Sequence, residues 1–117
     1  MKLELQVCSL PLAQRLQEFG VKQESLFKWE RSCSNGLEGW NVIYAPKAKE
    51  HVFAAFTVAE LGEIMSSVRY RSGCTANGDF IAYIHDNNDF HGRREDTEAD
   101  ARAKMLIYLL ENNLSEI

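Results

Sequence analysis

The stretch DTEADARAKMLIYLLENNL, residues 96–114, decides the fold. Thr97 is placed to cap a helix, and Asp100 three residues later completes a Thr-x-x-Asp capping box, which satisfies two backbone N–H groups at the helix start. Residues 105–110 then form a run of six apolar side chains, so the helix is apolar on every side and must be covered on more than one. This pattern predicts a central core helix that the rest of the chain surrounds.

The composition is that of one globular domain. The chain has 117 residues, of which 45% are apolar and 26% are charged. No apolar run approaches the roughly 20 residues that a membrane-spanning helix needs, and Glu4 interrupts what would be the apolar core of a secretory signal. Three cysteines at wide spacing are typical of free thiols in a reducing compartment. We therefore expect a single cytoplasmic domain over residues 1–117, not associated with a membrane.

The first twenty residues predict a short strand followed by a helix. Apolar and polar side chains alternate over residues 2–7, the period of a half-buried strand. Ser9 is placed to cap a helix that has Pro11 in its first turn. Gly20 is placed to end this helix in the left-handed conformation, with Val21 next to it in a Schellman motif.

A hairpin is predicted for the next segment. Residues 26–31 and 39–44 alternate and are rich in aromatic side chains, which is typical of strands. The linker between them contains Asn35-Gly36, a turn signal that indicates a hairpin. Residues 52–56 are apolar and predict a third, short strand or an extended lead-in.

A second helix and a second hairpin follow. Thr57 and Glu60 form another capping box, and Phe56 with Leu61 can form the hydrophobic staple beside it. Residues 68–72 and 80–85 predict a hairpin, after which residues 86–95 are expected to form a polar loop.

The predicted order is thus helix, hairpin, helix, hairpin, helix, with a possible extra strand at the N-terminus. Hairpins give an antiparallel sheet, and the amphipathic helices must cover it. The expected fold class is α+β, with one antiparallel sheet built from two hairpins and covered by three helices.

The charge distribution disfavours nucleic-acid binding. The formal net charge is −4, and residues 51–117 carry six Lys and Arg against eleven Asp and Glu, whereas neutralisation of phosphates usually requires a basic face. The basic clusters that could still bind nucleic acid are Arg69, Arg71, Arg93 and Arg94, with Tyr70 and Phe90 nearby for stacking. The alternative interpretation is that these arginines are ordinary exposed side chains, because Glu95 and Asp96 follow the second pair directly.

The segment from His85 to Gly92 is the candidate for a metal site. It contains two imidazoles and two carboxylates, and His85, Asp89 and His91 are the side chains that could bind a metal. The alternative is a solvated loop whose Asp and Asn side chains form turns. The spacing matches neither a calcium loop nor a zinc motif, and no glycine-rich phosphate loop occurs. We therefore predict no catalytic residues and no cofactor. A metal-dependent enzyme built on this segment is kept as the least favoured functional hypothesis.

Three aromatic side chains on the first hairpin, Trp29, Trp40 and Tyr44, leave two interpretations open. Packing in the core explains them most simply. An exposed aromatic face on a hairpin would instead mark a protein interface, where Trp and Tyr are enriched.

Three blocks, residues 20–29, 55–64 and 97–112, make the chain similar to a known group of proteins. It resembles the small uncharacterised proteins encoded by phages, prophages and related mobile elements of gut bacteria, of the Bacteroides type. The resemblance implies a cytoplasmic accessory protein with an α+β fold, and it implies no site residues. We expect a non-enzymatic module that binds another protein, with a homodimer as a further option. A nucleic-acid-associated accessory protein is the alternative.

Overall fold

The computed structural model describes residues 3–32, 39–47, 50–65, 71–86 and 89–112. Within these ranges the chain forms three α-helices, a short 3₁₀ helix and six strands. In chain order they are η1 (Leu3–Leu5), α1 (Leu10–Glu18), β1 (Phe27–Ser32), β2 (Gly39–Tyr44), β3 (Val52–Ala54), α2 (Val58–Ile64), β4 (Arg71–Cys74), β5 (Phe80–Asp86), β6 (Asp89–Glu95) and α3 (Glu98–Glu111). The predicted α+β class is confirmed.

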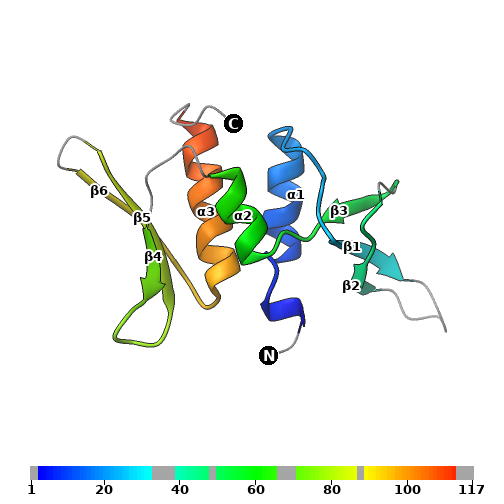
Figure 1. The fold of residues 1–117 in the computed structure, drawn as a ribbon, viewed down its shortest axis with the longest axis horizontal. Helices are drawn as coiled ribbons and strands as arrows, with labels where there is room; N and C mark the ends of the chain where they lie inside the picture. Colours follow the sequence, from blue (N-terminus) through cyan, green and yellow to red (C-terminus); the bar gives the residue numbers. More distant parts are fainter. Residues whose placement is uncertain (1–2, 33–38, 48–49, 66–70, 87–88, 113–117) are drawn as a thin grey trace.

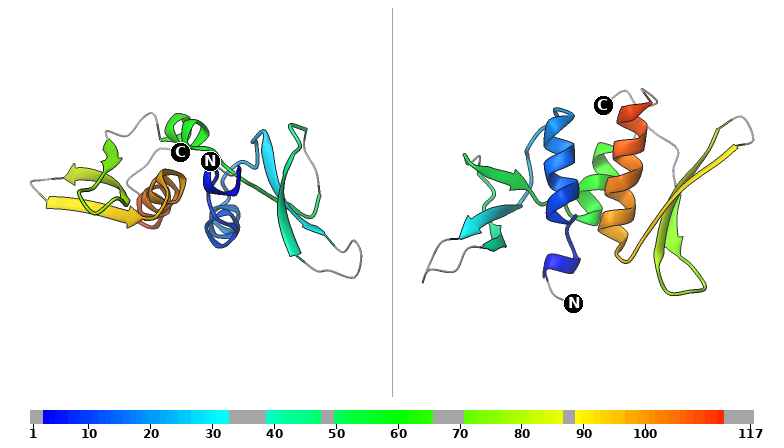
Figure 2. Two further views of the ribbon diagram at one scale, coloured as in Figure 1. Left: turned by 90° about the horizontal axis from the view of Figure 1, so that it is seen from below. Right: turned by 180° about the vertical axis from the view of Figure 1, so that it is seen from behind.

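The strands form two separate sheets, one on each side of the helices (Figures 1 and 2). Strands β2, β1 and β3 lie in that order in the first sheet, and β4, β5 and β6 in the second; all pairs are antiparallel. Helix α3 contacts the second sheet on one side and α1 and α2 on the other. The prediction of one sheet was therefore wrong. A helix that is apolar all round is covered here from both sides, which keeps the two hairpins apart.

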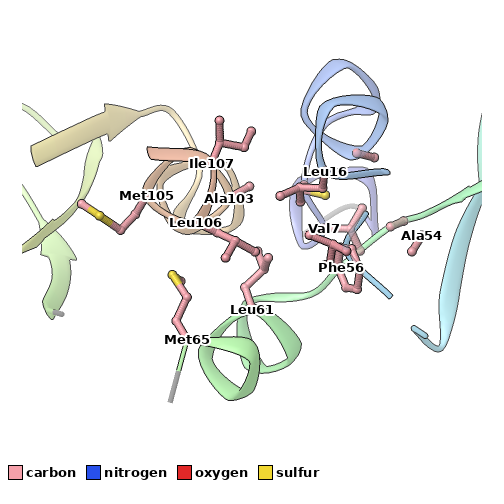
Figure 3. Close-up of a cluster of buried hydrophobic side chains, with 14 of the residues drawn as sticks. Val7, Leu16, Ala54, Phe56, Leu61, Met65, Ala103, Met105, Leu106 and Ile107 are labelled. Carbon is pink, nitrogen blue, oxygen red and sulfur yellow. The ribbon is translucent and has the colours of Figure 1, made fainter. Parts of the chain in front are cut away.

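The core is centred on α3, as predicted. Figure 3 shows Leu106 of α3 pointing toward Leu61 of α2, with Leu16 of α1 in the same cluster. The buried residues of α3 are Ala99, Ala101, Ala103, Met105, Leu106, Ile107 and Leu109. Small alanines occupy the first half of the helix and large side chains the second half.

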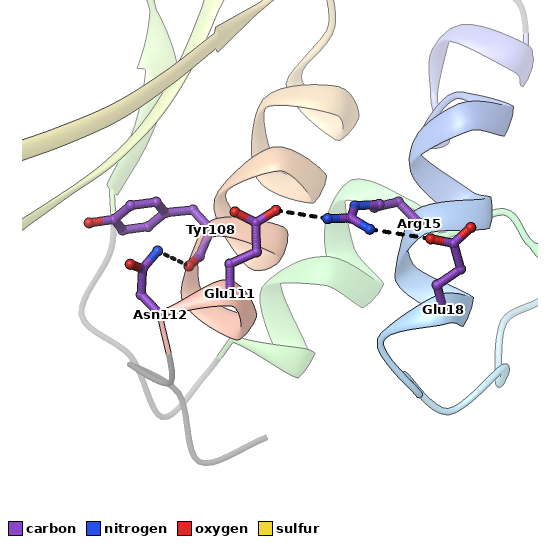
Figure 4. Close-up of polar contacts among 5 residues, drawn as sticks. All are labelled: Arg15, Glu18, Tyr108, Glu111 and Asn112. Atoms are coloured by element: carbon purple, nitrogen blue, oxygen red, sulfur yellow. Dashed lines mark hydrogen bonds and ion pairs between the residues drawn. The ribbon is translucent and has the colours of Figure 1, made fainter.

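Helix α1 ends as the sequence predicts. Gly20 has φ +82°, the Gly20 N–H donates to the Gln17 carbonyl at 2.9 Å, and the Val21 N–H donates to the Leu16 carbonyl at 3.1 Å. These two bonds are the Schellman pattern. Beyond them, Arg15 forms ion pairs at 3.3 Å with Glu18 on the same helix and with Glu111 on α3 (Figure 4). Both pairs are solvent-exposed, so they contribute little to stability.

The start of α3 differs from the predicted capping box in one bond. The Thr97 hydroxyl accepts from the Asp100 N–H at 3.2 Å, as expected. The Asp100 carboxylate, however, accepts from the Ser9 N–H at 2.6 Å. Ser9 precedes α1 and makes no side-chain cap bond. Asp100 therefore joins the starts of α1 and α3.

The predicted N-terminal strand was wrong. Residues Leu3–Leu5 form η1, closed by a 2.9 Å bond from the Gln6 N–H to the Leu3 carbonyl. Only Val7 keeps strand geometry, as an isolated antiparallel bridge to Thr57. In an antiparallel ladder Gln6 would pair next with Val58, but Val58 already belongs to α2. Alternation alone cannot form a strand without a neighbour to pair with.

The predicted polar loop over residues 86–95 was also wrong, because most of it is β6. Asp86 pairs with Asp89, so residues 87 and 88 are all that joins β5 to β6. Charged residues are typical of edge strands, and β6 is an edge. The short strand predicted over residues 52–56 is present as β3, paired with β1. The Asn35-Gly36 turn and residues 68–70 of the predicted second hairpin lie outside the described residues.

Candidate protein-binding groove

A groove with a volume of about 380 Å³ lies where the first turns of α2 and α3 meet both sheets. Its apolar lining consists of Leu3, Leu5, Phe27, Val58, Ala59, Phe80 and Ala99. Its polar lining consists of Gln6, Thr57, Asp96, Thr97 and Glu98. The segments that supply these residues are far apart in sequence, so the groove exists only in the folded chain.

The two capping motifs determine what the groove offers to a ligand. The Thr57 hydroxyl accepts from the Glu60 N–H, and the Thr97 hydroxyl accepts from the Asp100 N–H, each at 3.2 Å. The carboxylate of Glu60 accepts from the Thr57 N–H at 2.9 Å, which completes the predicted capping box. Backbone donors at helix starts are the usual anion-binding groups. Here they are partly occupied by the chain itself, so apolar contact is what the groove mainly provides.

The charge at the rim of the groove is negative. Asp96 is exposed, and Glu98 is about one-third exposed, with its carboxylate 3.4 Å from the Arg102 guanidinium and 3.3 Å from the Ser72 hydroxyl. None of the lining residues is a Lys, Arg or His. A ligand with positive charge next to apolar groups therefore matches this rim better than an anionic one.

An exposed aromatic side chain lies next to the groove. Tyr44 at the end of β2 is 67% exposed, and its ring packs edge-on against Phe27, with centroids 5.8 Å apart. Trp29 is buried and donates its indole N–H to the Cys8 carbonyl at 2.9 Å. Trp40 is half-buried against Phe53. Core packing thus accounts for Trp29, whereas Tyr44 lies at the surface.

The candidate metal ligands lie on β5 and β6. The register pairs His85 with Phe90, His91 with Ile84, and Asp89 with Asp86. Alternate positions of a strand belong to opposite faces, so positions 89 and 91 share one face and position 85 belongs to the other. The side chains of all three fall outside the described part of the structure, and among the residues that are described no His, Cys, Asp and Glu cluster could hold a metal ion. The metal site stays a prediction.

The second sheet brings some of the candidate arginines together. Position 71 of β4 pairs with Tyr83, and position 94 of β6 pairs with Ile81, so both belong to the same face of the sheet. Position 93 pairs with Ala82, whose side chain is buried on the opposite face. Arg94 is exposed, with its Nε 3.5 Å from the Asp79 carboxylate. Arg69 lies outside the described residues.

Two buried groups with shifted pKa values have structural roles. Cys8 is fully buried, and burial raises the pKa of its thiol from 9.0 to about 12, which excludes a thiolate nucleophile at neutral pH. Lys28 is 2% exposed and donates its ammonium to the carbonyls of Ser25 and Ala45. Burial lowers the pKa of Lys28, and the negative charge of Glu60 opposes that shift. The bonds of Lys28 hold the start of β1 to the end of β2.

Sequence reasoning missed the groove, although it found both helix starts that form it. No family model, curated protein or solved structure matches the chain. Among the described residues, no helix has the length and apolar character needed to cross a membrane.

Proposed function

We propose that this protein is a phage- or prophage-type accessory protein and a non-enzymatic interaction module, which binds a segment of another protein in the groove at the starts of α2 and α3. The apolar lining of the groove together with its acidic rim carries the proposal. A volume of about 380 Å³ lies within the range of ligand-binding pockets and accommodates a few side chains of a partner.

The chemistry of the groove selects the partner segment. Leu5 is 48% exposed and Tyr44 is 67% exposed, so apolar surface continues from the groove onto its surroundings. Asp96 and Glu98 provide carboxylates at the rim. The segment that fits best presents apolar side chains into the groove and a Lys or Arg toward the rim. Such a segment is an amphipathic, cationic peptide.

Two peptides of equal length test this chemistry. One alternates Leu with Lys, the other alternates Leu with Glu, and fluorescence anisotropy measures their binding. We expect the Lys peptide to bind at least about fivefold more tightly, a difference that corresponds to about 1 kcal/mol. Ala59→Trp should block the groove, because Ala59 lines it and is exposed. Ala76→Trp, at an exposed position in the β4–β5 turn, is the matched control. Equal binding of the two peptides, or equal effects of the two substitutions, would contradict the proposal.

The partner in cells is tested by photo-crosslinking. Benzoylphenylalanine is introduced at position 59 in one protein and at position 76 in another. We expect a discrete adduct from position 59 that is weakened by Asp96→Lys, and no adduct of the same size from position 76. An adduct that forms equally from both positions would show that the groove is not the binding site.

A nucleic-acid-associated role is the second candidate function. The observation in its favour is that positions 71 and 94 share one face of the second sheet with Tyr83, and arginines beside an aromatic ring suit a single strand of nucleic acid. The acidic charge of residues 51–117 and the Asp79–Arg94 ion pair weigh against it.

A further inference from the structure

The edges of the two sheets differ in how they are protected against pairing with another chain. Strand β6 contains four charged residues, and β4 has four residues that include Arg71 and Gly73. Strand β3 has three residues, and its Ala54 N–H is bonded to the Gln23 side chain at 2.8 Å. Charge, shortness and coverage are the usual means of protecting an edge.

Strand β2 is an edge that is neither charged nor short, and the element close to it besides β1 is η1. Its sequence, Gly-Trp-Asn-Val-Ile-Tyr, has no charge and no proline, and its β-branched and aromatic residues favour strand pairing. The first sheet lies at one end of the long axis of the molecule (Figure 1). At this edge a strand of six residues, four of them with high strand propensity (Trp40, Val42, Ile43 and Tyr44), is therefore available to another strand.

One backbone bond, together with the register of β1 and β2, shows which groups of β2 point to the open edge. The Ala45 N–H donates to the Leu26 carbonyl at 2.8 Å, which makes 45 and 26 a hydrogen-bonded pair. Hydrogen-bonded and non-bonded pairs alternate along an antiparallel ladder, so residues 43 and 41 also bond to β1. The N–H and C=O groups of Trp40, Val42 and Tyr44 therefore point outward. In the described part of the chain, no hydrogen bond covers these outward groups.

We infer that a second copy of this chain covers the edge, with β2 pairing antiparallel to β2 of the partner around a two-fold axis at Val42. In this register Val42 bonds to its own counterpart, and Trp40 bonds to Tyr44 of the other copy in both directions. All three sets of outward groups are then paired. If the axis is shifted to position 41 or 43, the outward N–H and C=O groups of one of these three residues have no partner in the other β2.

The side chains on this edge are self-complementary in the same register. Residues 40, 42 and 44 share one face of β2, so Trp40 lies beside Tyr44 of the other copy, and the two Val42 side chains meet at the axis. Tyr44 is 67% exposed in one copy and is covered by pairing. Because β2 carries no charge, self-pairing brings no like charges together. The result is a continuous six-stranded sheet.

Native mass spectrometry and sedimentation analysis test the dimer over a concentration series from about 1 to about 500 μM, which spans the affinities of transient complexes. We expect twice the 13.3 kDa chain mass at the upper end. Tyr44→Lys should leave only monomer at every concentration. Leu26→Lys, at a 49% exposed position outside β2, should leave the dimer unchanged. Monomer throughout for the unaltered chain, or a dimer that survives Tyr44→Lys, would overturn the inference.

A crosslinking experiment tests the register independently of folding defects. In a background in which Cys33 and Cys74 are both replaced by serine, Val42→Cys should form an intermolecular disulfide on mild oxidation, because the two positions meet at the axis. Asn41→Cys, on the other face and offset from its counterpart, should not. Equal crosslinking of the two variants, or crosslinking of position 41 alone, would overturn the proposed axis.

Discussion

Glu60 joins the start of α2 to the first sheet, and replacing it with alanine tests how much this connection stabilises the fold. Its carboxylate accepts from the Thr57 N–H at 2.9 Å, the Ser25 hydroxyl at 2.7 Å and the Leu26 N–H at 3.0 Å. Loss of the cap bond costs about 1 kcal/mol, and loss of a bond from a buried hydroxyl to a charged acceptor about 1.5 to 3 kcal/mol. The Leu26 N–H is in an exposed setting, where water replaces the acceptor. The expected loss for Glu60→Ala is therefore roughly 3 kcal/mol in the free energy of unfolding.

Urea unfolding followed by tryptophan fluorescence measures this loss, because Trp29 is buried in the folded chain. With a typical dependence on urea for a domain of this size, the midpoint should fall by about 2 M. Glu63→Ala is the matched control: Glu63 is exposed on the same helix, and the structure shows it in no hydrogen bond or ion pair with the described residues. Its free energy should change by less than about 0.5 kcal/mol.

Glu60→Gln separates the contributions of charge and of the acceptor. The amide oxygen can keep the bonds from Thr57 and Ser25, so we expect a loss of about 1 kcal/mol. The reasoning fails if Glu60→Ala costs less than about 1 kcal/mol, the value of a cap alone. In that case the bonds to Ser25 and Leu26 would add nothing to the local capping box.

Three further predictions concern buried or exposed charges. The pKa of the Cys8 thiol is raised from 9.0 to about 12, so its contribution to stability is complete below pH 9 and is lost as the pH rises toward 12. Cys8→Ala should flatten the alkaline loss of stability seen in urea titrations, whereas Cys74→Ala, at an exposed thiol, should not; equal slopes would refute this. Burial also raises the pKa of Asp100, so its charge costs stability as the pH rises through that pKa. Asp100→Asn keeps an acceptor for the Ser9 N–H, so this variant should match or exceed the stability of the unaltered chain at pH 7. Asp100→Ala removes the acceptor and should lose about 1 to 3 kcal/mol in the free energy of unfolding. An Asn variant less stable than the Ala variant would show that the charge itself is needed. If nucleic acid is a ligand, replacing Arg71 and Arg94 with alanine should abolish a salt-dependent gel shift of single-stranded DNA; no shift at low salt for the unaltered chain would exclude that candidate.

The sequence alone determined those features that depend on neighbours within a few residues. The central helix, the capping box of Thr57 and Glu60, and the ending of α1 at Gly20 were all predicted and are all present. In each case the donor and the acceptor are three to five residues apart. The chain cannot satisfy those backbone groups without adopting that local conformation.

The tertiary structure decided whatever depends on distant partners. Residues 2–7 have the alternation of a strand, but only Val7 finds a neighbour, and residues 89–95 form a strand because β5 lies beside them. The Asp100 carboxylate, expected to act within its own helix, bonds to Ser9 across 91 residues. The groove and the open edge of β2 arise in the same way. The packing of the three helices between two sheets decides which strands have neighbours and which side chains share a surface. No local pattern of residues encodes that arrangement.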